Sequence, residues 1–234
     1  MGTYIAGKKV GSVFIGGKRV GSMYKGGKCI YRADGGEVPI ECGLIFTGTQ
    51  YINTGIVGSS NLRVMVDCVI ESSSAGDTGM FGSRVSYGSN DFSFWSNSGS
   101  DNSILTSFNN YQTITHNKAL LGQRITIDKN KNVTTITPGN YSATSPVVSF
   151  SNTLPMFLGI VNNNGTAVST RRFNGTMFSC QISDNDVLVR DFVPIPQGNT
   201  KYSSTPAPSN CMWDKVTQQY FENAGTGNFG IADT

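Results

Sequence analysis

Residues 62–71 alternate between apolar side chains and mostly polar ones, and few folds can use such a pattern. The apolar side is made of Leu62, Val64, Val66, Cys68 and Ile70, and the other side carries Arg63, Asp67 and Glu71. Successive side chains of a β-strand point to opposite faces, whereas a helix repeats about every 3.6 residues. The alternation therefore predicts a strand with one side against a hydrophobic core.

Shorter patterns of the same kind follow along the chain. They lie at residues 91–95, 124–129, 133–137, 154–161, 176–182 and 187–193. Turn-forming residues separate several of them, as at residues 130–132 and 183–186. Only 14% of the residues are charged and 28 are glycine, which suits turns better than amphipathic helices. Many short strands at roughly ten-residue spacing predict an all-β fold, an antiparallel sandwich or jelly roll.

A ten-residue repeat occupies residues 1–33. Each copy has an aromatic residue, a Gly-Lys turn and then Val or Ile; these positions are Tyr4, Phe14, Tyr24, Val10, Val20 and Ile30. Because glycine accepts positive φ at little cost, the repeat predicts a short β-meander in which the aromatic residues align across successive strands. Three strands of about five residues bury too little apolar surface to be stable alone. We therefore expect this segment to pack on the body, on another copy or on another protein; a flexible leader is the alternative.

Basic charge is concentrated in the same repeat. Residues 1–33 hold seven basic side chains and no acidic one. The basic residues recur beside glycine, so we interpret them as solvated turn positions and expect no nucleic-acid partner. Residues 34–43, with Gly35, Gly36 and Pro39, are typical of a linker, and residues 44–234 form the predicted sandwich.

The cysteines indicate no zinc site. They are widely spaced and form no C-x-x-C pair: Cys29, Cys42, Cys68, Cys180 and Cys211. The chain has one histidine, so a zinc ion would find few ligands. Cys68 and Cys180 fall on the apolar sides of strand patterns, and we expect reduced core thiols and synthesis in a bacterial cytoplasm. No apolar run reaches about 18 residues, and we expect no secretory signal and no membrane insertion.

Several segments resemble one family. They are residues 45–56, 79–84, 157–159, 172–178, 189–194, 212–214 and 220–229. Together they resemble concanavalin A-like, laminin G-type domains of phage and gut-bacterial proteins, over about residues 44–231. The last motif is similar to those of phage tail, fibre and related virion proteins. The resemblance implies a concanavalin A-like jelly roll in a phage virion structural or adhesive protein, a fibre or decoration component. Residues 1–33 would bind other virion proteins or sibling copies, with a trimer favoured.

A lectin of this fold needs an aromatic ring for a sugar's apolar side and polar groups for its hydroxyls. Residues 87–97 supply both, and we take Tyr87, Asn90, Trp95 and Asn97 as candidate saccharide ligands, with host surface glycans as the expected partners. Alternation places Phe92 and Phe94 opposite Trp95, and either side could be the core. Calcium, common in this family, is possible at residues 101–102 or 184–186, although turn chemistry explains both.

Catalytic patterns are missing from the sequence. Glycosidases of this fold carry two carboxylates on one strand, but no Glu-x-Asp-x-Glu pattern occurs, and Glu41, Glu71 and Glu222 are isolated. His116 has no G-x-S-x-G partner motif. We expect no enzymatic activity and no cofactor. The alternatives are a bacterial cell-surface carbohydrate-binding module and an atypical glycoside hydrolase.

Overall fold

The computed structural model describes residues 42–71, 77–86, 88–97, 103–116, 120–139 and 141–233, together with the backbone of six short strands between residues 4 and 32. Two compact units are distinguished. Residues Cys42–Ala232 form one, and Met1–Glu41 with Asp233–Thr234 form the other. None of the described residues forms a helix long and apolar enough to span a membrane.

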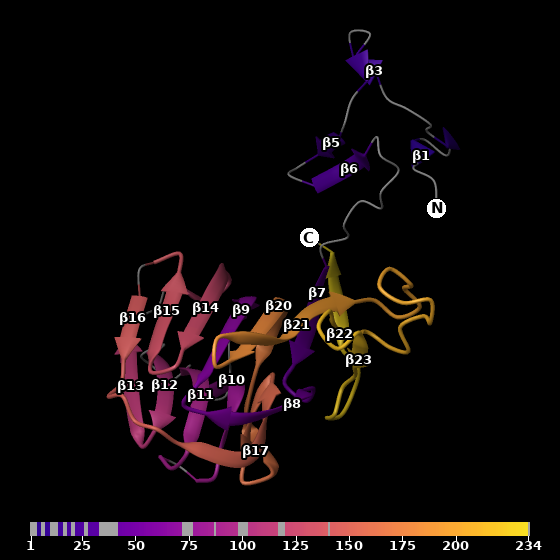
Figure 1. Cartoon of the computed structure of the whole chain (residues 1–234). Helices are drawn as coiled ribbons and strands as arrows, with labels where there is room; N and C mark the ends of the chain where they lie inside the picture. Colours follow the sequence, from indigo (N-terminus) through magenta and orange to yellow (C-terminus); the bar gives the residue numbers. More distant parts are fainter. Residues whose placement is uncertain are drawn as a thin grey trace. The chain divides into compact units, whose positions relative to one another are not determined.

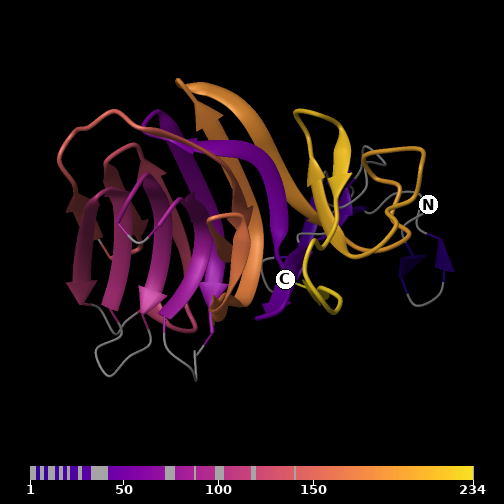
Figure 2. The same ribbon diagram turned by 90° about the horizontal axis from the view of Figure 1, so that it is seen from below.

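The larger unit consists of two packed β-sheets (Figures 1 and 2). The first sheet runs in the order β13-β12-β11-β10-β17-β8, with β18 and β19 attached beside β10. Its strands are β8 (Ile52–Ser59), β10 (Asp77–Arg84), β11 (Asp91–Asn97), β12 (Ser103–Asn109), β13 (Tyr111–His116), β17 (Ser151–Leu158), β18 (Ile160–Asn163) and β19 (Thr166–Arg172). The pairs on the main path are antiparallel, and β18 joins β10 in parallel.

The second sheet runs in the order β16-β15-β14-β9-β20-β21-β22-β23, with β7 paired to β20 and β24 paired to β7. Its strands are β7 (Cys42–Thr47), β9 (Leu62–Ile70), β14 (Arg124–Asn130), β15 (Val133–Thr137), β16 (Tyr141–Thr144), β20 (Asn174–Asp184), β21 (Val187–Ile195), β22 (Cys211–Asp214), β23 (Gln219–Phe221) and β24 (Gly230–Asp233). The predicted all-β antiparallel sandwich is confirmed. Because β7 begins at Cys42, the last two residues that we assigned to the linker belong to the sandwich.

The core lies between the sheets, where their inward-facing apolar side chains meet. The alternation in β9 is confirmed, because Val64, Val66 and Cys68 are fully buried while Arg63 on the other side is exposed. Cys68 and Cys180 are free and fully buried, as predicted. Burial raises the pKa of the Cys68 thiol far above its usual range, so this thiol stays protonated.

The C-terminal motif after β23 fastens onto the turn between β7 and β8. Gln50 is buried there, and its Nε2 donates to the backbone carbonyl of Asn228 at 3.0 Å. The side-chain oxygen of Asn223 accepts the Tyr51 N–H at 3.0 Å. Gly225 lies so close to a backbone carbonyl of this turn that a Cβ would collide with it. Residues 220–229, one of the motifs of the family resemblance, therefore have a structural role in the sandwich.

The repeat forms hairpins instead of the predicted β-meander. Its described strands are β1 (Tyr4–Ile5), β2 (Lys8–Lys9), β3 (Phe14–Ile15), β4 (Lys18–Arg19), β5 (Ser22–Lys25) and β6 (Lys28–Arg32), paired as three separate two-stranded sheets. The reason is the place of the glycine turn, which lies inside each repeat and folds that repeat on itself. Tyr4, Phe14, Tyr24 and Ile30 lie in strands of these hairpins, whereas Val10 and Val20 lie outside the described residues.

Candidate functional site

Strand β11 resolves which of its two sides faces the core. Phe92 and Phe94 belong to the hydrophobic core, so Asp91, Ser93 and Trp95 point to the opposite side of the first sheet. These three residues are nevertheless buried, with exposed fractions of 0%, 0% and 2%. The strand is therefore covered on both sides, with apolar contacts on one and polar contacts on the other.

Trp95 does not offer the exposed ring that we predicted as a sugar platform. It is paired with Gly79 on β10, and an added Cβ on that glycine would contact both the indole and Val161. The guanidinium carbon of Arg84 lies 5.0 Å from the ring centroid, and the indole N–H donates to the Ser93 hydroxyl at 2.7 Å. Because a glycine stands opposite, the ring occupies the space that a side chain would otherwise fill. Trp95 is a packing residue.

The other predicted saccharide ligands do not converge with Trp95 in the described part of the chain. Asn90 lies in the turn before β11 with a φ of 48°, and its carbonyl accepts a hydrogen bond from Asn152 at 2.8 Å. Asn90 therefore stabilises the turn before β11. Tyr87 lies outside the described residues, and Asn97 is described by its backbone alone, so both stay predictions.

A row of directly paired residues crosses the first sheet on the side away from the core. In strand order from β13 to β8 it contains Gln112, Ser107, Ser93, Gly82, Phe157 and Asn53. Gly82 has a φ of 139°, and a Cβ there would collide with the backbone of β11. No side chain therefore separates Ser93 from Phe157, on which Tyr51 stacks with ring centroids 4.6 Å apart. We call the polar part of this surface the outer face; it consists of Arg84, Asp91, Ser93, Trp95, Ser107 and Gln112.

Three buried polar atoms of the outer face have no hydrogen bond of good geometry among the described residues, although the Ser107 hydroxyl lies close enough to Asp91 to act on its carboxyl. They are Asp91 Oδ2, Ser107 Oγ and Gln112 Nε2. The other carboxylate oxygen of Asp91 accepts a hydrogen bond from Ser93. Buried polar groups in folded proteins almost always have a partner, whether protein, water or ligand. The outer face thus presents an acceptor, a hydroxyl that can donate or accept, and an amide donor.

Charge on the outer face centres on Asp91. Burial raises the pKa of this carboxyl to about 6, while hydrogen bonds from Ser93 and Ser107 and the positive charges of Arg84 and Lys129 act in the opposite direction. Arg84 itself donates from Nε to the side-chain oxygen of Asn163 at 2.9 Å. The charged groups that act on Asp91 are therefore both basic, whereas a retaining or inverting glycosidase would place a second carboxylate beside it.

Comparison with known proteins shows which fold the chain has but assigns it to no family. The sequence matches no protein-family model and no curated protein. Among solved structures, it is similar to a Bacteroides ovatus protein that has been proposed to bind carbohydrate, with 12% identity and a TM-score of 0.53. That match covers 83% of this chain but only 60% of the Bacteroides protein. The chain has a lectin-like β-sandwich fold.

A second solved structure shows a weaker likeness. It is a native heptameric SAP-like pentraxin from Limulus polyphemus, with 11% identity and a TM-score of 0.33. The match covers 63% of this chain and 71% of the pentraxin.

The possible calcium positions give no cluster of ligands in the described part of the chain. There, no three His, Cys, Asp or Glu side chains gather as a metal site would require. Asn185 and Asp186 have positive φ values in a tight turn, and Asp186 pairs with Lys131 at 3.3 Å. Residues 101–102 lie outside the described residues.

Sequence reasoning placed Asp91 and Ser93 beside Trp95 but missed Ser107 and Gln112. These two residues lie on different strands, and neither belongs to a recognisable motif. What unites them with Asp91 is the cross-strand register, which pairs Ser107 with both Ser93 and Gln112. The sequence offered no clear signal, because residues 103–109 and 111–116 each contain several polar side chains.

Proposed function

We propose that the sandwich is a carbohydrate-binding module whose ligand contacts the outer face. The observation that carries this proposal is the set of buried atoms on Asp91, Ser107 and Gln112 that lack a hydrogen bond of good geometry. Each hydroxyl of a sugar can donate one hydrogen bond and accept others, so adjacent hydroxyls match an acceptor, a mixed group and a donor. The fold of the Bacteroides ovatus protein, itself proposed to bind carbohydrate, supports the proposal.

A glycan array tests this proposal with the full-length chain. We expect one class of neutral glycan to bind, and Ser107→Ala and Gln112→Leu each to weaken that binding about tenfold, as the loss of one buried hydrogen bond would. Gln112→Leu removes a buried donor without a partner among the described residues, so the thermal stability of this free variant should stay the same or rise. A purely structural role would give the opposite result, a loss of stability.

Two control variants locate the ligand. Asn130 and Thr135 line an open groove of about 380 Å³ on the outside of the second sheet. Asn130→Ala and Thr135→Ala should leave glycan binding unchanged. Binding that is lost in these variants and kept in the outer-face variants would place the ligand on the wrong sheet for our proposal. An array on which nothing binds would reject carbohydrate binding altogether.

We also propose that the module has no hydrolytic activity, because the described groups that act on Asp91 include no second carboxylate. The glycans that bind on the array should release no reducing ends during prolonged incubation. An atypical glycoside hydrolase is the competing function, and release that is abolished by Asp91→Asn would support it.

Two biological settings fit a carbohydrate-binding module. The sequence resemblance supports a phage virion component, with the sandwich displayed for host attachment and residues 1–33 bound to other virion proteins. The likeness to a Bacteroides ovatus protein favours the alternative, a bacterial cell-surface module. In both settings we propose that the repeat joins the chain to a partner or to sibling copies, with a trimer favoured.

Deletion of residues 1–33 tests the role of the repeat. The sandwich should remain folded, because Cys42–Ala232 is a compact unit with its own core. Light scattering should show a monomer for the shortened chain and a trimer for the full-length chain, since two-stranded hairpins leave strand edges that other strands can pair. Addition to forming phage particles should incorporate the full-length chain alone. Equal scattering and equal incorporation of both chains would show that the repeat is no anchor.

A further inference from the structure

Lys129 is a charged residue in the hydrophobic core. It lies on the same face of β14 as Ile125 and Ile127, which point into the core. Its exposed fraction is 1%. Its ammonium donates one hydrogen bond, to the Thr106 hydroxyl at 2.9 Å. The Nζ atom lies 4.7 Å from the ring centroid of Phe92 and 5.7 Å from that of Phe108. A buried ammonium without a carboxylate beside it is costly, so its position requires an explanation.

The ammonium lies directly behind the outer face. Phe92 and Phe108 are a cross-strand pair of β11 and β12, and Lys129 covers that pair from the core side. The residues next to this pair in the two strands point to the other side of the sheet, and they include Asp91 and Ser107. These two strands thus have the Lys129 ammonium packed against one side and carry the Asp91 carboxylate on the other.

No described neighbour neutralises Lys129 on the core side. Its surroundings are Phe92 from β11, Thr106 and Phe108 from β12, Thr134 from β15 and Val64 from β9, and none of them carries a charge. Asp91 is the acidic group whose field reaches the ammonium. Arg84, on the outer face, is the second cation that acts on Asp91.

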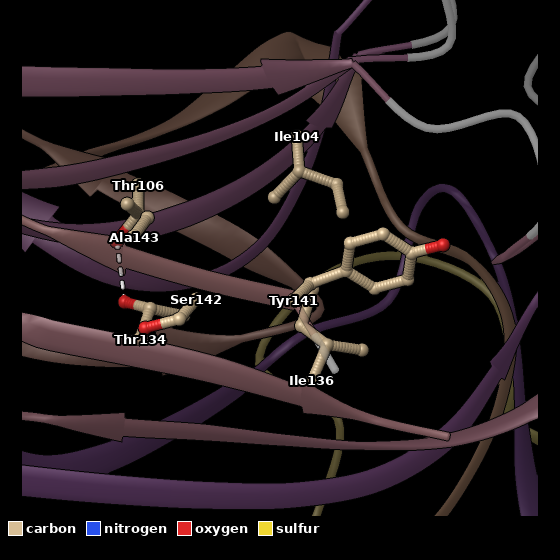
Figure 3. A pocket seen from close by; sticks show the side chains of 7 residues that line it. All are labelled: Ile104, Thr106, Thr134, Ile136, Tyr141, Ser142 and Ala143. Carbon is tan, nitrogen blue, oxygen red and sulfur yellow. Dashed lines mark hydrogen bonds between the residues drawn. The ribbon is translucent and has the colours of Figure 1, made fainter. Parts of the chain in front are cut away.

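Two hydroxyls lie between Lys129 and a small pocket of the sandwich. Thr106 and Thr134 are 2.8 Å apart and share a hydrogen bond. Both line a small pocket of about 10 Å³, whose wall also includes Ile104, Ile136 and Tyr141 (Figure 3). The pocket lies between β12 and the β15–β16 hairpin, and the outermost strands of the two sheets, β13 and β16, are in contact nearby. This volume admits about one water molecule. The Thr106 hydroxyl, which accepts from Lys129, therefore lies beside a space of this size.

We propose that Lys129 acts through Asp91 as a positioning residue of the outer face, so that its charge sets the pH at which Asp91 becomes a hydrogen-bond acceptor for ligand. The proposal deepens the carbohydrate-binding function and rests on it for its effect on affinity. The electrostatic coupling between the two residues does not depend on any ligand. When Lys129 is protonated it stabilises the Asp91 carboxylate, and when Lys129 is neutral this support is lost.

Lys129 and Asp91 therefore both titrate near neutral pH. Burial lowers the pKa of Lys129 from 10.5 to about 7, partly offset by the charge of Asp91, while the pKa of Asp91 is about 6. Between about pH 7 and 10 the unfolded chain holds a proton on Lys129 that the folded chain has released, so stability rises with pH in that window. Below about pH 6 Asp91 is protonated, so one of its oxygens becomes a donor and the carboxyl is a weaker hydrogen-bond acceptor.

Lys129→Met is the direct test, because methionine keeps the unbranched shape and packs well against aromatic rings. Carboxyl-carbon NMR of the ligand-free, full-length chain should show the Asp91 titration midpoint raised by about half a pH unit or more. Lys131→Met is the control. It removes a positive charge from a partly exposed side chain two residues after Lys129, and it should leave the Asp91 titration midpoint unchanged. The rise in stability between about pH 7 and 10 should disappear in Lys129→Met alone. An unchanged Asp91 midpoint in Lys129→Met would overturn the proposal.

A measurement on the unaltered protein covers the case in which Lys129→Met does not fold. Nitrogen NMR of the lysine side chains should show one ammonium titrating near pH 7, with a second inflection in the Asp91 carboxyl signal at the same pH. Titration of every lysine above about pH 9.5 would overturn the proposal.

The glycan found on the array supplies the last test. Its affinity should fall below about pH 6, and in Lys129→Met this fall should begin at a higher pH, so that binding near pH 6.5 is several-fold weaker than in the unaltered protein. An identical pH profile in the two proteins would reject the effect on affinity. If no glycan binds, the proposed function fails, and the two NMR titrations still decide whether Lys129 controls Asp91.

Discussion

Trp95→Ala is expected to lower the free energy of unfolding by about 3–5 kcal/mol, the usual cost of truncating a large buried aromatic side chain. The indole is 2% exposed and packs against β10 at Gly79. Its removal would leave a cavity beside Gly79, where no side chain can move in to fill the space. It would also withdraw the N–H that the Ser93 hydroxyl accepts and the ring beneath Arg84.

Two comparison variants separate packing from hydrogen bonding at this position. Trp95→Phe keeps most of the apolar contact and loses the N–H, so we expect a cost of about 1–2 kcal/mol. Tyr111→Ala removes an aromatic side chain that is 42% exposed and should cost under about 1 kcal/mol. Chemical denaturation followed by circular dichroism measures all three. A loss below about 1 kcal/mol for Trp95→Ala would mean that the ring is not packed in the interior.

The strands of the sandwich could be predicted because their burial repeats with the period of two that a pleated sheet imposes. Residues 62–71 predicted β9, and residues 124–137 predicted the β14–β15 hairpin around its turn. In both cases one side of the strand is apolar and the other is polar. The hydrophobic effect then selects the register, because a slip by one residue would expose every apolar side chain.

The same rule could not orient β11, where both sides are buried. Phe92 and Phe94 form one apolar side, while Trp95 adds an apolar residue to the other. The residues that decide the matter are distant in sequence: Gly79 on β10 makes room for the indole, and Val161 on β18 lies beside the same glycine. Period-two patterns say nothing about such partners, so the ring could be taken for an exposed sugar platform.

In the N-terminal segment, the sequence predicted a β-meander because the ten-residue spacing does not say where in each repeat the turn closes. Spacing of ten residues is compatible with one strand per repeat or with one hairpin per repeat. The pairing of Tyr4 with Lys9 and of Phe14 with Arg19 shows that the glycine turn closes within each copy. Lys129 was hidden for a related reason, because a lysine at an inward position of an alternating strand looks like the polar end of that strand.

Asp214→Ala is expected to cost about 3–5 kcal/mol, because the carboxylate is fully buried and holds together three parts of the second sheet. Its Oδ1 accepts the backbone N–H of Asp191 on β21 at 2.8 Å and that of Val216 in the next turn at 3.1 Å. Its Oδ2 accepts from the Thr217 hydroxyl at 2.7 Å and lies 3.6 Å from Arg190 Nε. Removal of this one group would leave buried donors on both strand and turn without an acceptor.

Asp128→Ala is the matched control for Asp214→Ala, since it removes the same side chain from an ion pair with an arginine. Asp128 accepts two hydrogen bonds from Arg63, but the side chains are 25% and 45% exposed, and water can replace either partner. We therefore expect a cost of at most about 1 kcal/mol. Chemical denaturation of both variants at one pH makes the comparison. Equal losses would show that the buried acceptor network at Asp214 has no special weight, and that the β21–β22 connection is held by apolar packing around Phe192 and Met212 instead.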